Sequence, residues 1–417
     1  MLWFQSDATS LRKLTRVMQR VLPDREGGVV VETGQDGIEF SALNPDTGVY
    51  ARAVLSARPL GKRRQTMLPV AFLENLLGEL GRGSVAVSVM TDNGGEALLV
   101  EAQTTGKQSR FPLSDKPVGQ GLAPELADMT NWHNGVFFRS TCPQDAREPL
   151  AAALCCAMRE TDVRLWSERH LHRILLDFDS LAADGVVVIA GSDGVRLSAA
   201  GWPVEVEGQC DGLRPAAITR DCAQAWKEVL DLRPNLIQFG VTESGEQSHL
   251  TFIARLNGPV GRIDFGQLNV YRNWARWRLL LYDADLELVV PTRPLLELAT
   301  AAKRLEREDN QLASMLVLMP QAKQRDYSLV AWPVASPRQK LTIQATLANP
   351  GKSRAKKLPD AVYLLPRNLL PILKHSLTEH VTLLFRERQR CLNLRAYGLE
   401  KGWFQGVIAL IDADAVS

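Results

Sequence analysis

His170 and His172 are the residues most suggestive of chemistry, because they flank a single leucine and stand near Glu168. In a strand, residues two apart share a face, so the two imidazoles could belong to a metal site. A third ligand at a recognisable spacing is missing, and the chain has no nucleophile elbow or Cys/His signature. We interpret these histidines as structural and predict that the protein is not an enzyme. A histidine-based activity is the remote alternative.

Gly351-Lys352-Ser353 has the ending of a phosphate-binding loop. That motif needs a glycine five residues before its Gly-Lys, where this chain has Thr346. It also needs an apolar helix afterwards, where this chain continues Arg354-Ala-Lys-Lys357. The segment is therefore predicted to be a basic surface loop between strands, and neither a cofactor nor a metal is expected.

The stretch from Gly185 to Gly201 is rich in glycine, which could suggest a dinucleotide-binding turn. A dinucleotide motif requires its glycines to open a helix. Here a β-branched run is followed by the turn Ser192-Asp193-Gly194 and by a short alternating segment. These features predict a β-hairpin in which Val195–Ala199 is the returning strand.

The bulk properties are those of an ordinary globular protein. The chain has 417 residues, of which 45% are hydrophobic and 23% charged, and its net charge is +2. This length suits roughly two to four domains, and the charge neither requires nor excludes a nucleic-acid partner. The apolar runs are too short for a membrane span, no secretion signal is visible, and the six cysteines contain no CxxC pair. We expect a cytoplasmic protein with reduced, structural thiols.

Basic residues recur along one face of the first predicted helix, Asp7–Leu22. Arg12, Arg16 and Arg20 are spaced by four. Lys13 lies beside them, and the opposite face is apolar. Such a helix could simply be solvated on its charged side. Alternatively, several helices that turn basic faces toward a common channel would complement the phosphates of DNA.

One arrangement of elements recurs three times, at intervals of about 139 residues. Each third opens with an amphipathic helix, passes through strands to a second helix, and ends in more strands. The predicted opening helices are Asp7–Leu22, Asp145–Arg159 and Pro291–Arg307. The predicted second helices are Leu68–Leu80, Ile218–Leu232 and Leu365–Leu377, with Pro69 and Pro366 at first-turn positions.

Pairs of strands are predicted after each second helix, with turn residues between them. They are Ser84–Val89 with Ala97–Ala102, Leu236–Val241 with Leu250–Leu256, and Val381–Phe385 with Cys391–Ala396. Linkers are predicted at Ser114–Asn134 and near Asn257–Gly266. The order favours one α+β unit that occurs three times.

Three segments carry a resemblance to a known family. Gly106-Lys-Gln-Ser-Arg-Phe-Pro-Leu113 is similar to a Gly-x-Ser-Arg-Phe-x-Leu edge strand, with one extra residue. Ser192-Asp-Gly-Val-Arg-Leu197 is similar to a Thr-Asp-Gly-His-Arg-Leu segment, and it follows Thr161-Asp-Val-Arg164 at about the expected spacing. Pro294-Leu295-Leu296 begins a helix that matches the first helix of a third domain. In this order the chain resembles the bacterial DNA sliding clamp, the beta subunit of DNA polymerase III.

The resemblance implies an α+β DNA-clamp fold. Three similar domains, each with two helices packed on antiparallel sheets, would form a ring as a head-to-tail dimer. The domains would be residues 1–130, 131–266 and 267–417. The implied function is that of a processivity factor, which encircles duplex DNA without reading its sequence. DNA polymerase and clamp-loader subunits would be tethered through short peptides, and no membrane is involved.

Three sets of residues are assigned on this basis. The pore would contact DNA through Arg12, Lys13, Arg16, Arg20, Arg220, Lys303, Arg304, Arg367 and Lys374. Partner peptides would dock on Ser192, Gly194, Val195, Arg196 and Leu197. The dimer interface would use Phe111, Leu295 and Leu296.

Two departures from the family pattern affect the expected peptide site. Val195 stands in place of a histidine, and the chain ends Ile408-Ala-Leu-Ile-Asp-Ala-Asp-Ala-Val-Ser417 without the family's Met-Pro-Met tail. We therefore expect a divergent clamp that binds standard clamp-binding peptides weakly and prefers a dedicated partner. The alternative is a clamp-fold scaffold or inhibitor that binds replication or defence proteins without encircling DNA.

Overall fold

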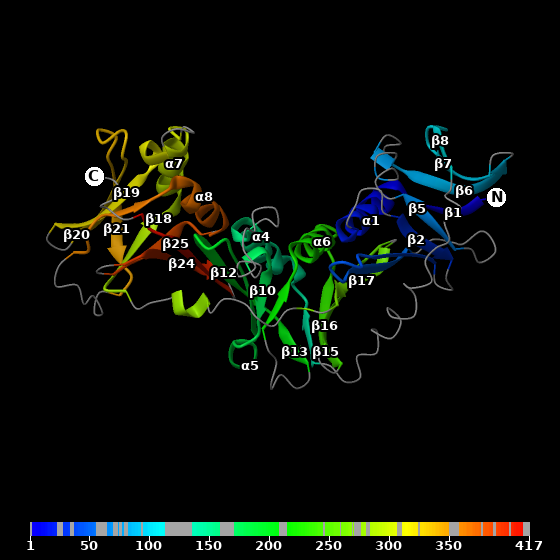
Figure 1. The fold of residues 1–417 in the computed structure, drawn as a ribbon, viewed down its shortest axis with the longest axis horizontal. Helices are drawn as coiled ribbons and strands as arrows, with labels where there is room; N and C mark the ends of the chain where they lie inside the picture. The colour runs from blue at the N-terminus through cyan, green and yellow to red at the C-terminus, as the bar shows by residue number, and fades with distance from the viewer. Residues whose placement is uncertain are drawn as a thin grey trace. The chain divides into compact units, whose positions relative to one another are not determined.

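The computed structural model of this chain consists of antiparallel sheets with helices packed on them (Figure 1). It describes residues 2–22, 28–33, 37–55, 65–69, 74, 77–78, 82–92, 95–112, 136–158, 171–207, 215–244, 247–258, 260–268, 270, 277–280, 284–306, 311–323, 326–349, 358–376, 378–386, 389–399 and 402–411. The chain divides into two compact units. The first contains Met1–Arg147 and Val204–Arg272, and the second contains Glu148–Pro203 and Asn273–Ser417.

A nine-stranded sheet forms the base of the first unit. Its strands follow the order β13 (Glu205–Glu207), β9 (Val136–Ser140), β15 (Leu236–Ser244), β16 (Gln247–Arg255), β17 (Val260–Gln267), β4 (Val49–Leu55), β3 (Ile38–Leu43), β2 (Gly28–Thr33) and β5 (Gln65–Pro69). β17 pairs with β4, so that Phe265 lies opposite Ala51. This pairing joins segments that are more than two hundred residues apart into one continuous sheet.

A four-stranded sheet belongs to the same unit. Its order is β1 (Leu2–Asp7), β6 (Ser84–Asp92), β7 (Gly95–Ala102) and β8 (Gln108–Pro112). Within the described residues β8 lies at an edge of this sheet. The edge strand expected between Gly106 and Leu113 is therefore found over Gln108–Pro112.

Two helices, α1 (Ala8–Val21) and α6 (Arg220–Asp231), pack against each other on the nine-stranded sheet. The carboxylate of Asp7 accepts a hydrogen bond from the Ser10 N–H at 2.7 Å and so caps α1. The hydroxyl of Thr219 accepts one from the Cys222 N–H at 3.2 Å and caps α6. The short strand β14 (Ala216–Ile218) leads into α6, and a 3-10 turn, η2, spans Pro143–Ala146.

The apolar sides of these helices form the core of the unit. α1 buries Leu11, Leu14, Val17, Met18 and Val21, all 0% exposed. On α6, the indole of Trp226 lies 4.9 Å from the ring of Phe252, which stacks on Phe265 at 4.7 Å. Aromatic contacts of this kind add to the free energy of burial. Because these contacts bury the apolar side of each helix, they determine which side of the helix carries the polar residues.

The second unit is built on a longer sheet. Its strands follow the order β10 (Ile174–Asp177), β11 (Val186–Ser192), β12 (Arg196–Pro203), β25 (Gly402–Ala409), β24 (Cys391–Leu399), β23 (His380–Phe385), β18 (Leu286–Pro291), β21 (Leu341–Leu347), β20 (Asp326–Pro333), β19 (Leu316–Lys323) and β22 (Val362–Leu364). β11 and β12 form the hairpin that was predicted between Gly185 and Gly201. β12 in turn pairs with β25, with Leu197 opposite Val407.

The helices of the second unit lie on this sheet. They are α4 (Arg147–Cys156), α5 (Leu181–Asp184), α7 (Thr292–Lys303) and α8 (Pro366–His375), with 3-10 turns η5 (Trp277–Leu280) and η6 (Gln311–Ser314). α7 and α8 pack against each other, α7 also touches β20 and β21, and α8 touches β25. Pro366 occupies the first turn of α8, as predicted, because its missing N–H needs no partner there.

The predicted order of elements is confirmed for the described residues, with three corrections. Leu68 and Pro69 end strand β5 and do not begin a helix; helical conformation is described at Glu74, Leu77 and Gly78. The predicted linker near Asn257–Gly266 is mostly strand β17, because its alternating apolar residues enter the sheet. The predicted opening helix at Asp145–Arg159 is shorter, since a 3-10 turn precedes α4 and α4 ends at Cys156.

The opening helices α1 and α7 also follow a strand, β1 and β18 respectively, which the sequence analysis did not foresee. The strands β14 and β22, which precede the second helices α6 and α8, agree with the predicted order. The linker predicted at Ser114–Asn134 lies outside the described residues. The boundaries of three domains stay a prediction.

Gly191 provides a test of the packing between β11 and α4. A Cβ atom at this position would lie 2.1 Å from the carbonyl oxygen of Ala153, a backbone atom that cannot turn aside. We predict that Gly191→Ala lowers the free energy of unfolding by about 2 kcal/mol or more, measured by chemical denaturation. Gly78→Ala is the matched control, because the nearest atom to its new Cβ would be 3.6 Å away. Equal stability of the two variants would contradict the packing described here.

Candidate nucleic-acid and partner interface

The outward side of α1 carries the basic residues predicted for DNA. Lys13, Arg16 and Arg20 are exposed. Arg12 is half-buried. Its guanidinium lies close to Gly78, since a Cβ atom added to Gly78 would be 3.6 Å from it. The four residues therefore lie on one side of the helix, as their spacing predicts, but Arg12 is turned against the neighbouring helical segment.

Glutamates partly neutralise this surface. Arg16 Nε lies 2.7 Å from Glu74 Oε1, and Arg20 Nε lies 3.4 Å from Glu228 Oε1 on α6. The hydrogen bond with Glu74 raises the pKa of Arg16, so this residue stays cationic at any physiological pH. Both arginines remain exposed despite these contacts. The exposed surface of the α1–α6 pair is thus a mixture of cations and carboxylates.

The remaining predicted DNA contacts lie at the ends of other helices. Arg220 is half-buried in the first turn of α6. Lys303 and Arg304 are exposed at the end of α7, and Arg367 and Lys374 are exposed on α8. Arg367 Nη1 lies 3.0 Å from Glu306 Oε1, and this ion pair links α8 to the residues that follow α7. Each unit therefore gathers its predicted contacts on one pair of helices, α1 with α6 and α7 with α8.

The β11–β12 hairpin, where peptides were predicted to dock, is closed by hydrogen bonds made by the side chains of Ser192 and Asp193. The Asp193 carboxylate accepts from the N–H groups of Val195, at 3.0 Å, and Arg196, at 2.9 Å. The Ser192 hydroxyl accepts from the Gly194 N–H at 3.1 Å and donates to the Arg196 carbonyl at 3.0 Å. Gly194 has φ of +84°, which favours glycine over other residues. These hydrogen bonds define the conformation of the turn.

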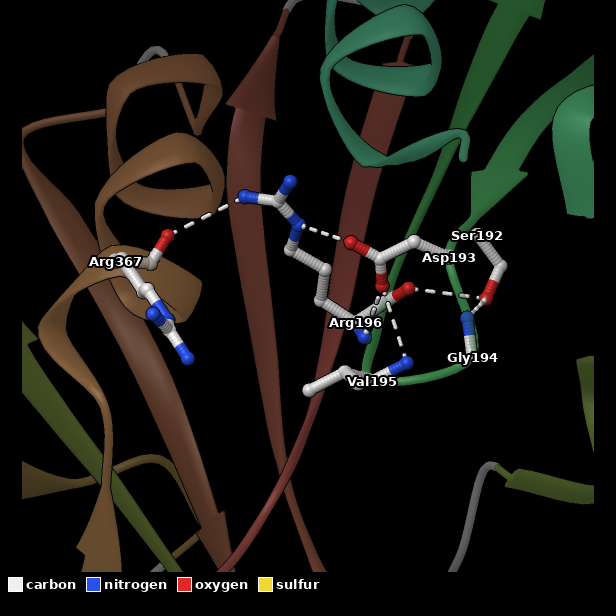
Figure 2. A network of polar contacts seen from close by, with 6 residues as sticks. All are labelled: Ser192, Asp193, Gly194, Val195, Arg196 and Arg367. Atoms are coloured by element: carbon white, nitrogen blue, oxygen red, sulfur yellow. Dashed lines mark hydrogen bonds and ion pairs between the residues drawn. The ribbon is translucent and has the colours of Figure 1, made fainter. Parts of the chain in front are cut away.

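Arg196 joins this hairpin to α8 (Figure 2). Its Nε donates to Asp193 Oδ2 at 2.8 Å, and its Nη1 donates to the carbonyl oxygen of Arg367 at 3.2 Å. That carbonyl belongs to the first turn of α8. Arg196 therefore has fewer N–H groups left for a peptide than the sequence suggested, and its main contacts position the turn beside the helix.

The five residues predicted for peptide docking differ in accessibility. Gly194 and Val195 are exposed, with Val195 at 46%, and Arg196 is half-buried. Ser192 is buried, and Leu197 is 2% exposed within a core cluster that includes Trp277 and Val407. Leu197 was predicted to contact peptides, but its side chain points into the core of the sheet, so a role for it as a pocket residue stays a prediction.

The end of the described chain flanks the same hairpin. The Ala409 N–H donates to the Val195 carbonyl at 2.7 Å, and Ile408 pairs with Arg196 in the sheet. The carbonyl of Tyr363 accepts from the Ile411 N–H at 2.9 Å. Ile408 and Ala409 thus lie beside the turn, and Ile411 lies beside β22.

The residues predicted for the dimer interface are not equally available. Leu295 is 0% exposed and belongs to the core under α7, whereas Leu296 is partly buried on the same helix. Helix geometry turns Leu295 toward the sheet, and its role in a dimer interface stays a prediction. Phe111 is in β8, and its side chain lies outside the described part of the chain. Of these two leucines, only Leu296 has a side chain that is partly accessible to a partner.

Other segments weighed from the sequence contribute nothing to these surfaces. Gly351-Lys352-Ser353, Thr161-Asp-Val-Arg164, Glu168 and His170 lie outside the described residues. In the described part of the chain, no three side chains of His, Cys, Asp or Glu are grouped to hold a metal. None of the helices in the described ranges is both long and apolar enough to cross a membrane.

Three structural residues were missed by the sequence analysis. Asp193 organises the hairpin, and the Ser-Asp-Gly turn could have revealed it, because Asp side chains commonly bond to N–H groups two residues on. Glu74 and Glu228 neutralise arginines of α1. Glu228 is 208 positions from Arg20, and no local signal in the sequence predicts that contact.

Together these features define the fold as a DNA clamp, in which helix pairs lie on antiparallel sheets and a structured hairpin stands beside a helix of the same unit. The beta subunit of DNA polymerase III from Thermotoga maritima is 13% identical with a TM-score of 0.73, over 99% of this chain and 100% of that chain. A beta sliding clamp from C. crescentus is 12% identical with a TM-score of 0.70, over 99% and 100%. A DNA polymerase sliding clamp from Bacillus subtilis is 13% identical with a TM-score of 0.67, over 99% of each chain. Comparison of the sequence with protein-family models and with curated proteins gives no match.

Leu197 and Val195 allow the buried and the exposed positions of the hairpin to be tested separately. Leu197→Lys places an amine in the core, so we predict a loss of about 3 kcal/mol or more in the free energy of unfolding. Val195→Lys is the control, because an exposed side chain should tolerate lysine within about 0.5 kcal/mol. Urea denaturation of both variants measures the difference. A stable Leu197→Lys protein would restore the interpretation of Leu197 as a pocket residue.

Proposed function

We propose that this protein is a divergent DNA sliding clamp, which encircles duplex DNA and tethers DNA polymerase or other replication and repair proteins. The observation that carries the proposal is a clamp fold shared over 99% of the chain and 100% of the Thermotoga maritima beta subunit. A fold matched over nearly all of both chains supports the same mechanical role. Fold alone does not determine function, so the surfaces must support it too.

The helix pairs support contact with DNA. Exposed cations lie along α1, α7 and α8. Such contacts bind phosphates through charge and leave sequence unread, which is what a protein that slides requires. The proposed pore contacts are Lys13, Arg16, Arg20, Arg220, Lys303, Arg304, Arg367 and Lys374, with Arg12 at the margin.

The hairpin and α8 support a partner site. Val195 presents an exposed apolar side chain on a turn that Asp193 and Arg196 hold rigid. A preformed surface loses little entropy when a short peptide binds, which favours recognition of extended or disordered tails. Gly194, Val195 and Arg196 are the proposed contacts. Neither role requires catalysis, and no cofactor takes part.

The remaining parts of the proposal concern assembly. We propose three similar domains, residues 1–130, 131–266 and 267–417, and a ring of two chains in the cytoplasm. Among the described strands β8 lies at a sheet edge, which supports pairing with another chain, because edge strands are where a neighbouring chain can add a strand. Leu296, on α7, is the proposed apolar contact.

A second candidate function is a clamp-fold scaffold that binds proteins without encircling DNA. The ion pairs favour it, because Arg16, Arg20 and Arg367 each lie against a glutamate. Retention on DNA separates the candidates. A ring should stay on circular duplex in high salt and slip from the same duplex after linearisation, and it should sediment as a dimer at micromolar concentration. Monomers that are washed from both DNA forms would favour the scaffold.

The ion pairs of α1 give a sharper test of the DNA surface. We predict that Arg16→Ala with Arg20→Ala weakens duplex binding and reduces the dependence of log K on log salt by up to about 0.9 per lost phosphate contact. Glu228→Gln should do the opposite, because it releases Arg20 for phosphate. Fluorescence anisotropy with duplexes of different sequence measures both effects.

Glu205→Gln is the matched control for that experiment, since it removes an exposed carboxylate paired with Arg139 on strands and not on helices. If Glu228→Gln and Glu205→Gln change DNA affinity equally, the effect is one of net charge, and the proposed surface on α1 is wrong.

The partner site makes a prediction of its own. Restoring the family's residue with Val195→His should tighten binding of a clamp-binding peptide from a DNA polymerase by about threefold or more, because a contact at the centre of a small site contributes strongly. Leu341→His is the control, since Leu341 is another exposed apolar residue of the same unit. Calorimetry or anisotropy measures the affinity. Identical peptide affinities for wild type and Val195→His would count against this site.

A further inference from the structure

A cluster of three ionisable side chains joins α4 to α8, among residues that the proposed function does not use. Glu148 lies in the first turn of α4, and Cys155 lies in its last turn. Seven residues make nearly two helical turns, so both side chains lie on one face of α4. His375 ends α8, and its Nδ1 lies 3.3 Å from Glu148 Oε2. The three side chains come from helices that are more than two hundred residues apart.

The imidazole of His375 is placed to carry a positive charge. A hydrogen bond with Cys155, the largest contribution, raises the pKa of His375; burial opposes it, and Glu148 raises the pKa further. His375 is also the last residue of α8, where the helix dipole favours a cation. An imidazolium beside a thiol stabilises the thiolate form of that thiol.

The two adjacent cysteines of α4 contrast sharply. Cys155 is exposed, whereas Cys156 is 1% exposed. Burial raises the pKa of Cys156 to about 12, so it stays a protonated thiol. An exposed thiol with an imidazole beside it is more reactive than a buried thiol, because the thiolate is the nucleophile and the imidazole favours the thiolate. Within the described residues this cluster does not qualify as a metal site.

We propose that Cys155 is a reactive thiol, with His375 as the base that holds its proton and Glu148 as the residue that orients His375, and that it exchanges with small disulfides. The Cys155 sulfur attacks one sulfur of the disulfide, and the disulfide's S–S bond breaks. A mixed disulfide forms on Cys155, and a small thiolate departs. The proton held by His375 goes to that thiolate, so one thiol and one disulfide are consumed and one of each is formed.

The competing interpretation is an ordinary surface cysteine that happens to lie near a histidine. Both interpretations allow Cys155 to react, so rate and pH dependence separate them. Cys142 is exposed as well and provides a comparison within the same chain. The inference does not rest on the proposed function, because it concerns groups that neither DNA nor peptide is proposed to contact.

The first experiment uses the reduced full-length protein. A small aromatic disulfide, 4,4′-dithiodipyridine, is added for timed intervals at pH 5 to 9, the reaction is quenched with acid, and peptide mass spectrometry gives the labelling rate of each cysteine. At pH 7 Cys155 should react about fivefold faster than Cys142 or more, since its thiolate fraction is larger. Its rate should also reach half of its maximum below the ordinary thiol value of about 8.5. Equal rates and equal profiles for the two cysteines would overturn the proposal.

The second experiment removes the base. His375→Gln keeps a hydrogen-bonding side chain but cannot carry the charge, so the Cys155 rate at pH 7 should fall about fivefold and its profile should move to higher pH. Glu148→Gln should act in the same direction with a smaller effect, and Cys142 should be unaffected in both. Circular dichroism and thermal melting check that each variant folds. A folded His375→Gln protein with an unchanged Cys155 profile refutes the role of His375; if that variant does not fold, Glu148→Gln and the wild-type profiles decide.

Discussion

The burial of one apolar side of each helix against a sheet is the constraint on which the rest of this structure depends. In α1, Leu11, Leu14 and Met18 are fully buried, and each contributes about 1.5–3 kcal/mol relative to exposure. Rotating the helix by half a turn would expose these side chains and bury Arg16 and Arg20. The positions of the cations are therefore a consequence of core packing, and they do not need to be specified by contacts of their own.

The same constraint explains why glutamates accompany the cations. Once α1 and α6 lie side by side, Arg20 and Glu228 are brought together by the packing of their apolar sides. An exposed ion pair of this kind adds only about 0–1 kcal/mol to stability, so it is a weak reason for keeping either residue. Its effect on binding can be larger. A guanidinium that is paired with a carboxylate can exchange the carboxylate for a phosphate at little cost. When the protein moves along the DNA and the phosphate is lost, the guanidinium can pair with the carboxylate again. Under the proposed function, such exchange suits a protein that is retained by topology and must not hold any one position on DNA.

Local patterns were sufficient for most of the fold and insufficient for the details of the sites. The 3.6-residue periodicity of α1 predicts its bounds within a residue, and the β-branched run before Ser192 predicts the β11–β12 hairpin. Pro69 misled, because proline is acceptable both at the start of a helix and at the end of an edge strand, and only the pairing of β5 with β2 decides between them. The accessibility of Leu197 and Leu295 could not be read from motifs, since it depends on Trp277, Val407 and the strands beneath α7. Contacts such as that of Arg20 with Glu228 join positions far apart in the chain, and no local signal carries them.

Under the proposed function, the hairpin shows how a clamp fold shared at 10–13% identity can keep its framework while a partner surface changes. Its first strand is fixed by Gly191, where the backbone of α4 leaves no room for a Cβ atom. Its second strand is fixed by Leu197 in the core, and Arg196 ties the turn to the first turn of α8. Val195 lies between these fixed points and contributes no side chain to any of them. Substitution there costs the fold almost nothing, so this position is free to follow a change of partner. The rigid neighbours then present whatever residue stands at Val195 in the same place, because the turn's geometry is set by Asp193 and Gly194 and not by the exposed side chain.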